Sequence, residues 1–153
     1  MRIAAARWQF TLSAASPGAL LMLGFCEQIG NSAAQVSKHG LLTDGRAFSH
    51  SQAFSVSVDD DAADDTWHTE TCRKLRAGDA VTFVFRPMLH SVEAHVHGVN
   101  VFTWELRPDA WVYPMVQTYR EQAYDVALTK YQVIAYPDLE SLVEQVEAQG
   151  ERA

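Results

Sequence analysis

The sequence predicts a single α+β domain over residues 1–150, with a mainly antiparallel sheet of barrel- or sandwich-like form and two or three helices. The chain has 153 residues, 48% of them hydrophobic, which suits one buried core and leaves too little for two. Most apolar stretches alternate with polar residues at the period of a half-buried strand. Three others carry helix start signals. Residues 151–153 are expected to be a disordered tail.

The strands are predicted from alternation and from turn residues between them. Trp8, Phe10 and Leu12 alternate with polar neighbours and give the first strand. Asp44-Gly45 has the composition of a two-residue hairpin turn, flanked by apolar segments. His39 and His50 flank this hairpin and are expected at the surface. Further strands are predicted over residues 54–58, 67–72, 81–85, 92–96, 99–105 and 131–136, with Gly98 as a bend between two of them.

The helices are predicted from capping signals. Ser16-Pro17 precedes the apolar run 19–29, which favours a buried helix over a strand there. Pro114 can open a short second helix. Asp138 is a plausible cap for a C-terminal helix, because the apolar residues after it recur at helical spacing, at Leu139, Leu142, Val143 and Val146.

Composition excludes several classes of function. Twelve basic against nineteen acidic side chains give a net charge of −7, so direct nucleic acid binding and attraction to anionic membranes are not expected, whereas a basic protein partner is. No apolar run reaches the roughly 20 residues of a membrane span. Cys26 and Cys72 form no C-x-x-C motif, and the scattered glycines form no phosphate loop. We expect a cytoplasmic protein with reduced thiols.

Histidines and carboxylates form the most informative cluster. On a strand, Glu93, His95 and His97 share one face, and His68 and Glu70 share a face of the strand predicted over residues 67–72. If those two strands were neighbours, these groups would converge, and His95 and His97 with one of Glu93, His68 or Glu70 would suit a zinc or iron ion. The alternative is that both faces are ordinary solvent-exposed sides of antiparallel strands.

Two further features suggest surfaces for a protein partner. An acidic run between residues 59 and 65 contains Asp59, Asp60, Asp61, Asp64 and Asp65. It is either a solvated loop or a docking surface for a basic protein. A second set is aromatic and lies close to two prolines, at Trp104, Trp111 and Tyr113, which makes an exposed interaction patch our interpretation.

Three functions fit these observations. The first is a small acidic protein-interaction module, an accessory, inhibitory or assembly subunit that needs no catalysis or cofactor and can also form homo-oligomers. The second is a metal-dependent enzyme or metal-binding protein that uses the His-x-His strand and one zinc or iron ion. The third is a small-ligand-binding domain whose apolar pocket is lined by Trp8, Phe83, Phe85 and Trp104. The missing catalytic motifs favour the first.

Overall fold

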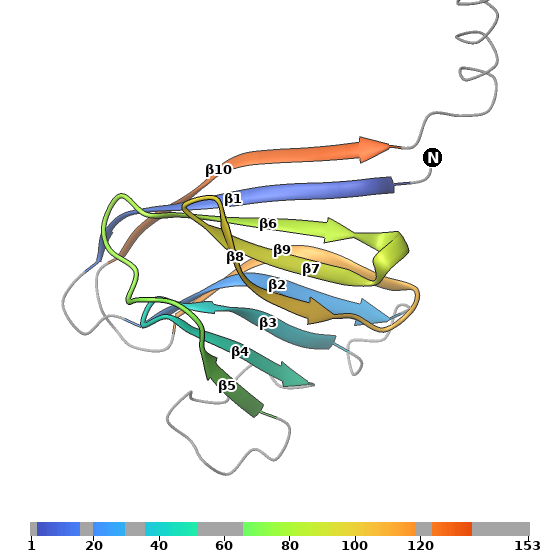
Figure 1. The fold of residues 1–153 in the computed structure, drawn as a ribbon, viewed down its shortest axis with the longest axis horizontal. Helices are drawn as coiled ribbons and strands as arrows, with labels where there is room; N and C mark the ends of the chain where they lie inside the picture. Colours follow the sequence, from blue (N-terminus) through green and yellow to red (C-terminus); the bar gives the residue numbers. More distant parts are fainter. Residues whose placement is uncertain (1–2, 16–19, 30–35, 52–65, 119–123, 136–153) are drawn as a thin grey trace, which may run out of the picture.

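The computed structural model describes residues 3–15, 20–29, 36–51, 66–118 and 124–135, which form two five-stranded antiparallel sheets (Figure 1). The strands are β1 (Ile3–Ala15), β2 (Leu21–Ile29), β3 (Val36–Leu42), β4 (Arg46–Ser51), β5 (Thr66–Glu70), β6 (Ala80–Arg86), β7 (Ser91–Val96), β8 (Val99–Glu105), β9 (Ala110–Thr118) and β10 (Tyr124–Ala135). The first sheet has the order β10-β1-β6-β7-β8 and the second β5-β4-β3-β2-β9. A 3-10 turn, η2 (Pro87–Leu89), links β6 to β7.

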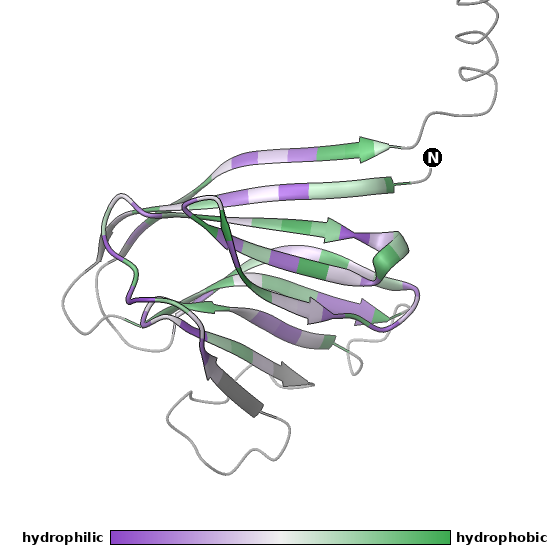
Figure 2. Cartoon of the chain, viewed as in Figure 1, coloured by the Kyte–Doolittle hydropathy of each residue, from purple (hydrophilic) through white to green (hydrophobic). Residues whose placement is uncertain are grey.

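Alternation along the strands decides which side chains face the core. Trp8 of β1 is buried and lies opposite Phe83 of β6, whereas the next pair, Arg7 and Val84, points to the other side of the sheet. Figure 2 shows the resulting succession of polar and apolar residues along several strands. The predicted first strand is therefore confirmed, as are the strands over 81–85, 92–96 and 99–105.

An aromatic cluster joins the two sheets. Phe25 of the second sheet packs edge-on against Trp104 of the first, with ring centroids 5.5 Å apart, and Trp8 stacks on Phe83 at 5.6 Å. All four side chains are buried. Rings in such contact stabilise the core beyond the area that they bury. Three of the four residues predicted to line an apolar ligand pocket, Trp8, Phe83 and Trp104, thus pack against one another and against Phe25.

The helix predicted over 19–29 is wrong, because this segment is strand β2. Leu23 and Phe25 face the core between the sheets, whereas Met22 packs on the opposite face with Leu42 and Phe48. A central strand that is buried on both faces is apolar at nearly every position. Such a run does not differ in sequence pattern from a buried helix.

The helix predicted at Pro114 is also wrong, since this residue lies within strand β9. Within the described part of the chain, β9 is an edge strand that pairs with β2 alone, and an edge strand tolerates the missing N–H of proline. The described residues contain no α-helix, so the α+β class is corrected there to an antiparallel β-sandwich. The helix predicted at Asp138 and the strand predicted over 54–58 lie outside the described residues. Within the described part no helix is long and apolar enough to cross a membrane.

The hairpin predicted at Asp44-Gly45 is confirmed, but its loop spans three residues, 43–45, instead of the predicted two, and it also anchors the chain after β5. Gly45 has a positive φ of 97°, and Asp44 accepts hydrogen bonds from the backbone and side chain of Arg46 at 3.1 and 2.7 Å. The carbonyl oxygen of Gly45 accepts hydrogen bonds from the backbone N–H groups of Thr71, at 3.0 Å, and Cys72, at 3.3 Å. This turn therefore holds the start of the segment that leads to the cavity described below.

Candidate functional site

The outer face of the first sheet is hollowed by a cavity of about 380 Å³. It lies over β1, β6 and β7, whose outward side chains are aligned by the strand register, Gln9 beside Thr82 and Thr82 beside His95. The polar side chains that line it are Arg7, Gln9, Thr82, Arg86, His95 and His97. Its walls are thus carried by three neighbouring strands of a hydrogen-bonded sheet, which fixes their spacing.

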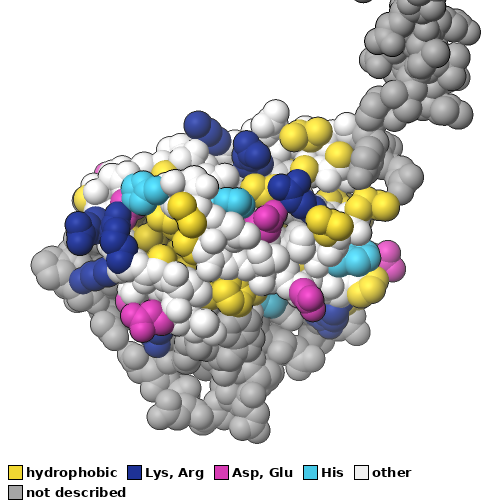
Figure 3. Space-filling view, in the orientation of Figure 1, with side chains coloured by type: hydrophobic (Ala, Val, Ile, Leu, Met, Phe, Trp, Pro, Cys, Tyr) yellow, Lys and Arg dark blue, Asp and Glu magenta, His cyan; other side chains and the backbone are white. Residues whose placement is uncertain are grey.

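Charges on this face are unevenly paired. The Arg86 guanidinium is bound to the Glu93 carboxylate at 2.8 Å, whereas Arg7 is exposed and has no acidic partner among the described residues. Nε2 of His95 is buried without a hydrogen bond, and the nearest Glu93 oxygen is 3.8 Å away. In Figure 3, basic and histidine side chains are spread over the surface where Figure 1 places β10, β1, β6 and β7.

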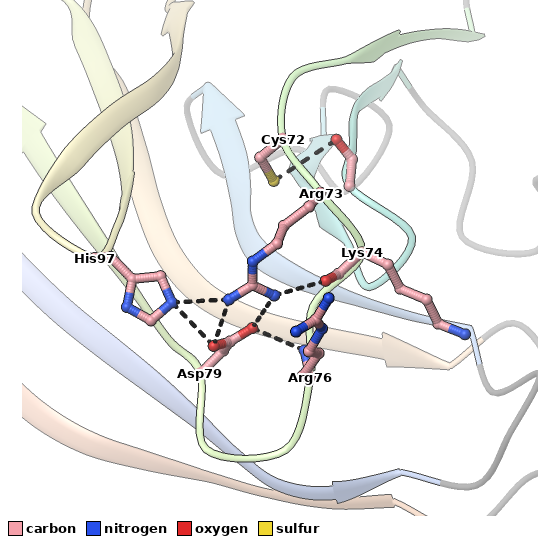
Figure 4. Close-up of polar contacts among 7 residues, drawn as sticks. Cys72, Arg73, Lys74, Arg76, Asp79 and His97 are labelled. Carbon is pink, nitrogen blue, oxygen red and sulfur yellow. Dashed lines mark hydrogen bonds and ion pairs between the residues drawn. The ribbon is translucent and has the colours of Figure 1, made fainter.

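A compact ion-pair cluster (Figure 4) lies beside the cavity, and one of its members, His97, lines it. Asp79 is only 6% exposed. Its carboxylate accepts hydrogen bonds from both terminal nitrogens of Arg73, at 3.0 and 3.2 Å, and from the backbone N–H of Arg76, at 2.7 Å. Burial alone would raise the pKa of Asp79, but these hydrogen bonds and the Arg73 charge outweigh it, so the pKa is lowered. The carboxylate therefore stays ionised and holds the turn before β6.

His97 belongs to the same cluster. It follows the end of β7 with a positive φ of 51°, and Gly98, with φ 77°, completes the predicted bend to β8. Its Nε2 lies 3.0 Å from Asp79 and 3.1 Å from Arg73. A protonated Nε2 donates to the carboxylate, whereas an unprotonated one accepts from the guanidinium. Either way this nitrogen is occupied by the protein.

The structure does not bring the five predicted metal ligands together. Glu93 and His95 share the outer face of β7, with His97 just beyond its end. His68 and Glu70 lie on β5, which belongs to the other sheet and is hydrogen-bonded to β4. The prediction required these two strands to be neighbours. Among the residues that the structure describes, no group of three His, Cys, Asp or Glu side chains is arranged to hold a metal ion.

The predicted aromatic patch is divided between core and surface. Trp104 is 3% exposed and belongs to the core. Trp111 and Tyr113 of β9 are 62% and 50% exposed, and both point to the outer face of the second sheet, opposite Gln28 and Cys26 of β2. The predicted acidic docking surface, five aspartates between residues 59 and 65, lies outside the described part of the chain.

A buried polar network inside the sandwich was not expected from the sequence. His39 lies in β3 and is buried, not at the surface as predicted. Its Nδ1 is 2.6 Å from Ser49 Oγ, and its Nε2 is 2.9 Å from Glu27 Oε1. The other Glu27 oxygen accepts the backbone N–H of Arg107 at 2.8 Å. A serine, a histidine and a carboxylate in series can activate a hydroxyl, but only where substrate reaches it.

Burial assigns this network to stability. Ser49 is 6% exposed, so its hydroxyl is not presented to solvent. Burial alone would raise the pKa of Glu27, yet the hydrogen bonds from His39 and from the Arg107 backbone, with their charges, lower it overall. The signal in the sequence is parity: with Leu41 pointing inward on a strand, His39 must point inward too. Parity alone does not say which face of β3 is buried, because that depends on the strands and sheet that pack around it.

These features define the chain as an antiparallel β-sandwich with a basic cavity on one outer face and an exposed aromatic pair on an edge strand. The chain matches no model of a known protein family, and no curated protein matches it. Function must therefore be argued from the sites themselves.

Proposed function

We propose that this chain is a protein-interaction module without catalytic activity, and that it binds its partner through the aromatic pair of β9. The observation that supports this is the exposure of Trp111 and Tyr113, 62% and 50%, side by side on one face of an edge strand. The sandwich has a filled aromatic core of its own, so these two rings are not needed for that core.

Trp and Tyr are the side chains most often responsible for binding energy at protein interfaces, because each buries a large area with few rotatable bonds. Their polar N–H and O–H groups also remain satisfied by water in the free protein. Met115, partly buried beside them on β9, extends the apolar surface. A partner with a shallow apolar groove fits such a surface.

Pro114 decides the mode of binding. A free edge strand can bind a partner by adding a further strand, but that requires an unbroken row of N–H and C=O groups. Pro114, in the middle of β9, removes one of these donors. Recognition by the outward side chains of Trp111 and Tyr113 is therefore favoured over strand addition.

A zinc or iron function receives less support. Glu93 and His95 lie 3.8 Å apart on one strand, and among the described residues no third ligand-type side chain completes a metal site with them. A structural or catalytic zinc site needs at least three protein ligands. The interaction module remains the proposal.

The test is a comparison of two surface variants. Trp111→Ala/Tyr113→Ala removes the aromatic pair, and Val99→Ala, at a residue 63% exposed on β8, removes an apolar side chain elsewhere. We expect the double variant to lose a protein that co-purifies stoichiometrically with the wild type and to lose any concentration-dependent increase in mass measured by light scattering. Val99→Ala should keep both. Equal co-purification and equal mass for the double variant and the wild type would contradict the proposal.

A further inference from the structure

We propose that the cavity on the outer face of the first sheet is a binding site for a small oxyanion ligand, a compound with a carboxylate or phosphate group, held by Arg7. This site is distinct from the aromatic pair of β9, which lies on the outer face of the other sheet.

The charge of the sandwich itself permits this ligand, although the chain as a whole is acidic. The described residues contain nine Lys and Arg against eight Asp and Glu. The other eleven of the nineteen acidic side chains belong to segments outside them. Coulomb attraction acts over roughly a Debye length, about 8–10 Å, so the groups around the cavity matter more than the total charge.

Arg7 is the group placed to bind the anion. It stands on β1 between β10 and β6, with Gln132 on one side and Val84 on the other. Its guanidinium has no carboxylate partner among the described residues, and Lys130, opposite the neighbouring Gln9, adds a second cation to this face. A guanidinium presents a planar fork of N–H donors that matches the two oxygens of a carboxylate or phosphate.

The carboxylates near the cavity do not compete for Arg7. Glu93 is held by Arg86 at 2.8 Å, and Asp79 is held by Arg73 at 3.0 Å. Both negative charges are therefore already compensated by their own arginines. An anion that enters the cavity meets an uncompensated cation instead of a preformed ion pair.

Uncommitted hydrogen-bonding groups complete the site. Among the described residues, the side chains of Gln9 and Thr82 have no hydrogen-bond partner, and both line the cavity. Val84, at 4% exposure, contributes apolar surface to the same cavity.

Size sets the ligand class. A cavity of about 380 Å³ is at the lower end of the range for small-molecule sites, roughly 300–1,000 Å³. One anionic head group with a short carbon body fills it. Small carboxylic acids and phosphate monoesters both meet this description, and they share the oxyanion that Arg7 would bind.

The experiment follows the ring C–H signals of the histidines by NMR while inorganic phosphate or succinate is added to the full-length protein. His95→Asn assigns the signal of His95. Each titration is repeated with sodium chloride at matched ionic strength. Arg7→Gln removes the proposed anchor, and Lys74→Gln removes one charge from an exposed residue outside the cavity lining.

We expect a saturable shift of the His95 signal in the wild type and in Lys74→Gln. In Arg7→Gln we expect the dissociation constant to rise by about tenfold or more. Saturation by phosphate alone assigns the phosphate esters, and saturation by succinate alone assigns the carboxylic acids. Shifts that never saturate, that sodium chloride reproduces, or that are equal in Arg7→Gln and Lys74→Gln would overturn the proposal. If Arg7→Gln does not fold, Thr82→Val, of nearly equal volume, is expected to weaken the same titration; unchanged binding there would overturn it.

Discussion

The buried carboxylate of Glu27 allows the sharpest test of what stabilises this sandwich. It is 3% exposed and accepts two hydrogen bonds, from His39 Nε2 at 2.9 Å and from the Arg107 backbone at 2.8 Å. Glu27→Gln keeps the shape and removes the charge. The amide oxygen of the new side chain can accept the hydrogen bond from the Arg107 backbone. Its NH₂ group can donate a hydrogen bond to His39 if the imidazole carries its proton on Nδ1, toward Ser49. Glu27→Ala removes both acceptors.

The magnitudes follow from the two bonds. A hydrogen bond to a charged group contributes about 1.5–3 kcal/mol, and a neutral one about 0.5–1.5 kcal/mol. Glu27→Gln should therefore lower the free energy of unfolding by about 2 kcal/mol. Glu27→Ala leaves two buried donors unpaired, and breaking a buried pair in this way costs about 3–5 kcal/mol. Glu105→Gln, at an exposed position on β8, is the matched control, expected to change stability by about 0.5 kcal/mol or less.

The assay is urea unfolding followed by tryptophan fluorescence, since Trp8 and Trp104 are buried in the core. The pKa of Glu27 is lower in the folded protein than in the unfolded chain, so its contribution is present above the unfolded pKa and is lost as the pH falls through the folded one. The difference in the free energy of unfolding between the wild type and Glu27→Gln should thus become smaller from neutral pH to about pH 3. The reasoning would be refuted if Glu27→Gln lowered the free energy of unfolding no more than Glu105→Gln does, or if the difference from the wild type stayed constant over this pH range.

Three further substitutions have defined outcomes. Gly24→Ala would place a Cβ on the carbonyl oxygen of His39, so we expect the free energy of unfolding to fall by about 3 kcal/mol or more; an unchanged melting temperature would contradict this. Asp79→Asn should cost about 1–3 kcal/mol at neutral pH in urea unfolding, because its hydrogen bonds with Arg73 lose a charge. That cost should disappear as the pH falls through the lowered pKa of Asp79, and its persistence in acid would count against the ion pair. Burial lowers the pKa of Lys38 from 10.5 to about 8, so wild-type stability should rise between those pH values, and Lys38→Met should abolish the rise. An identical rise in both proteins would show that Lys38 is not its source.

Much of the sheet could be predicted from local pattern, because its strands have one polar and one apolar face. β1 and β7 show this alternation, and Asp44-Gly45 marks the position of a hairpin, whose loop has three residues instead of the predicted two. β2 could not be separated from a helix, since both of its faces are buried. The prediction there rested on Ser16-Pro17, a helix start signal, and Leu21–Ile29 form a strand regardless of it. Tertiary burial outweighed the local signal.

The candidate cavity could be predicted only in part, for a different reason. Parity placed Glu93 and His95 together on one face of one strand. The short link between β6 and β7 favours their pairing, but nothing in the sequence indicates that β6 lies beside β1, and therefore that Arg7 and His95 line the same hollow. Strand order and register depend on contacts between segments distant in the chain, and a shift of one residue would turn every side chain to the opposite face.

Net charge was the least informative property of the chain, because it averages over segments with different compositions. The value of −7 predicts a basic partner and no attraction to phosphate. The described sandwich nevertheless has one more basic than acidic side chain, and the outer face of its first sheet carries Arg7 and Lys130 without carboxylate partners among the described residues. A surface field depends on where charges are fixed and which are already paired. An anion site on an acidic protein is therefore consistent with electrostatics, provided that the acidic groups near it are compensated, as Glu93 and Asp79 are.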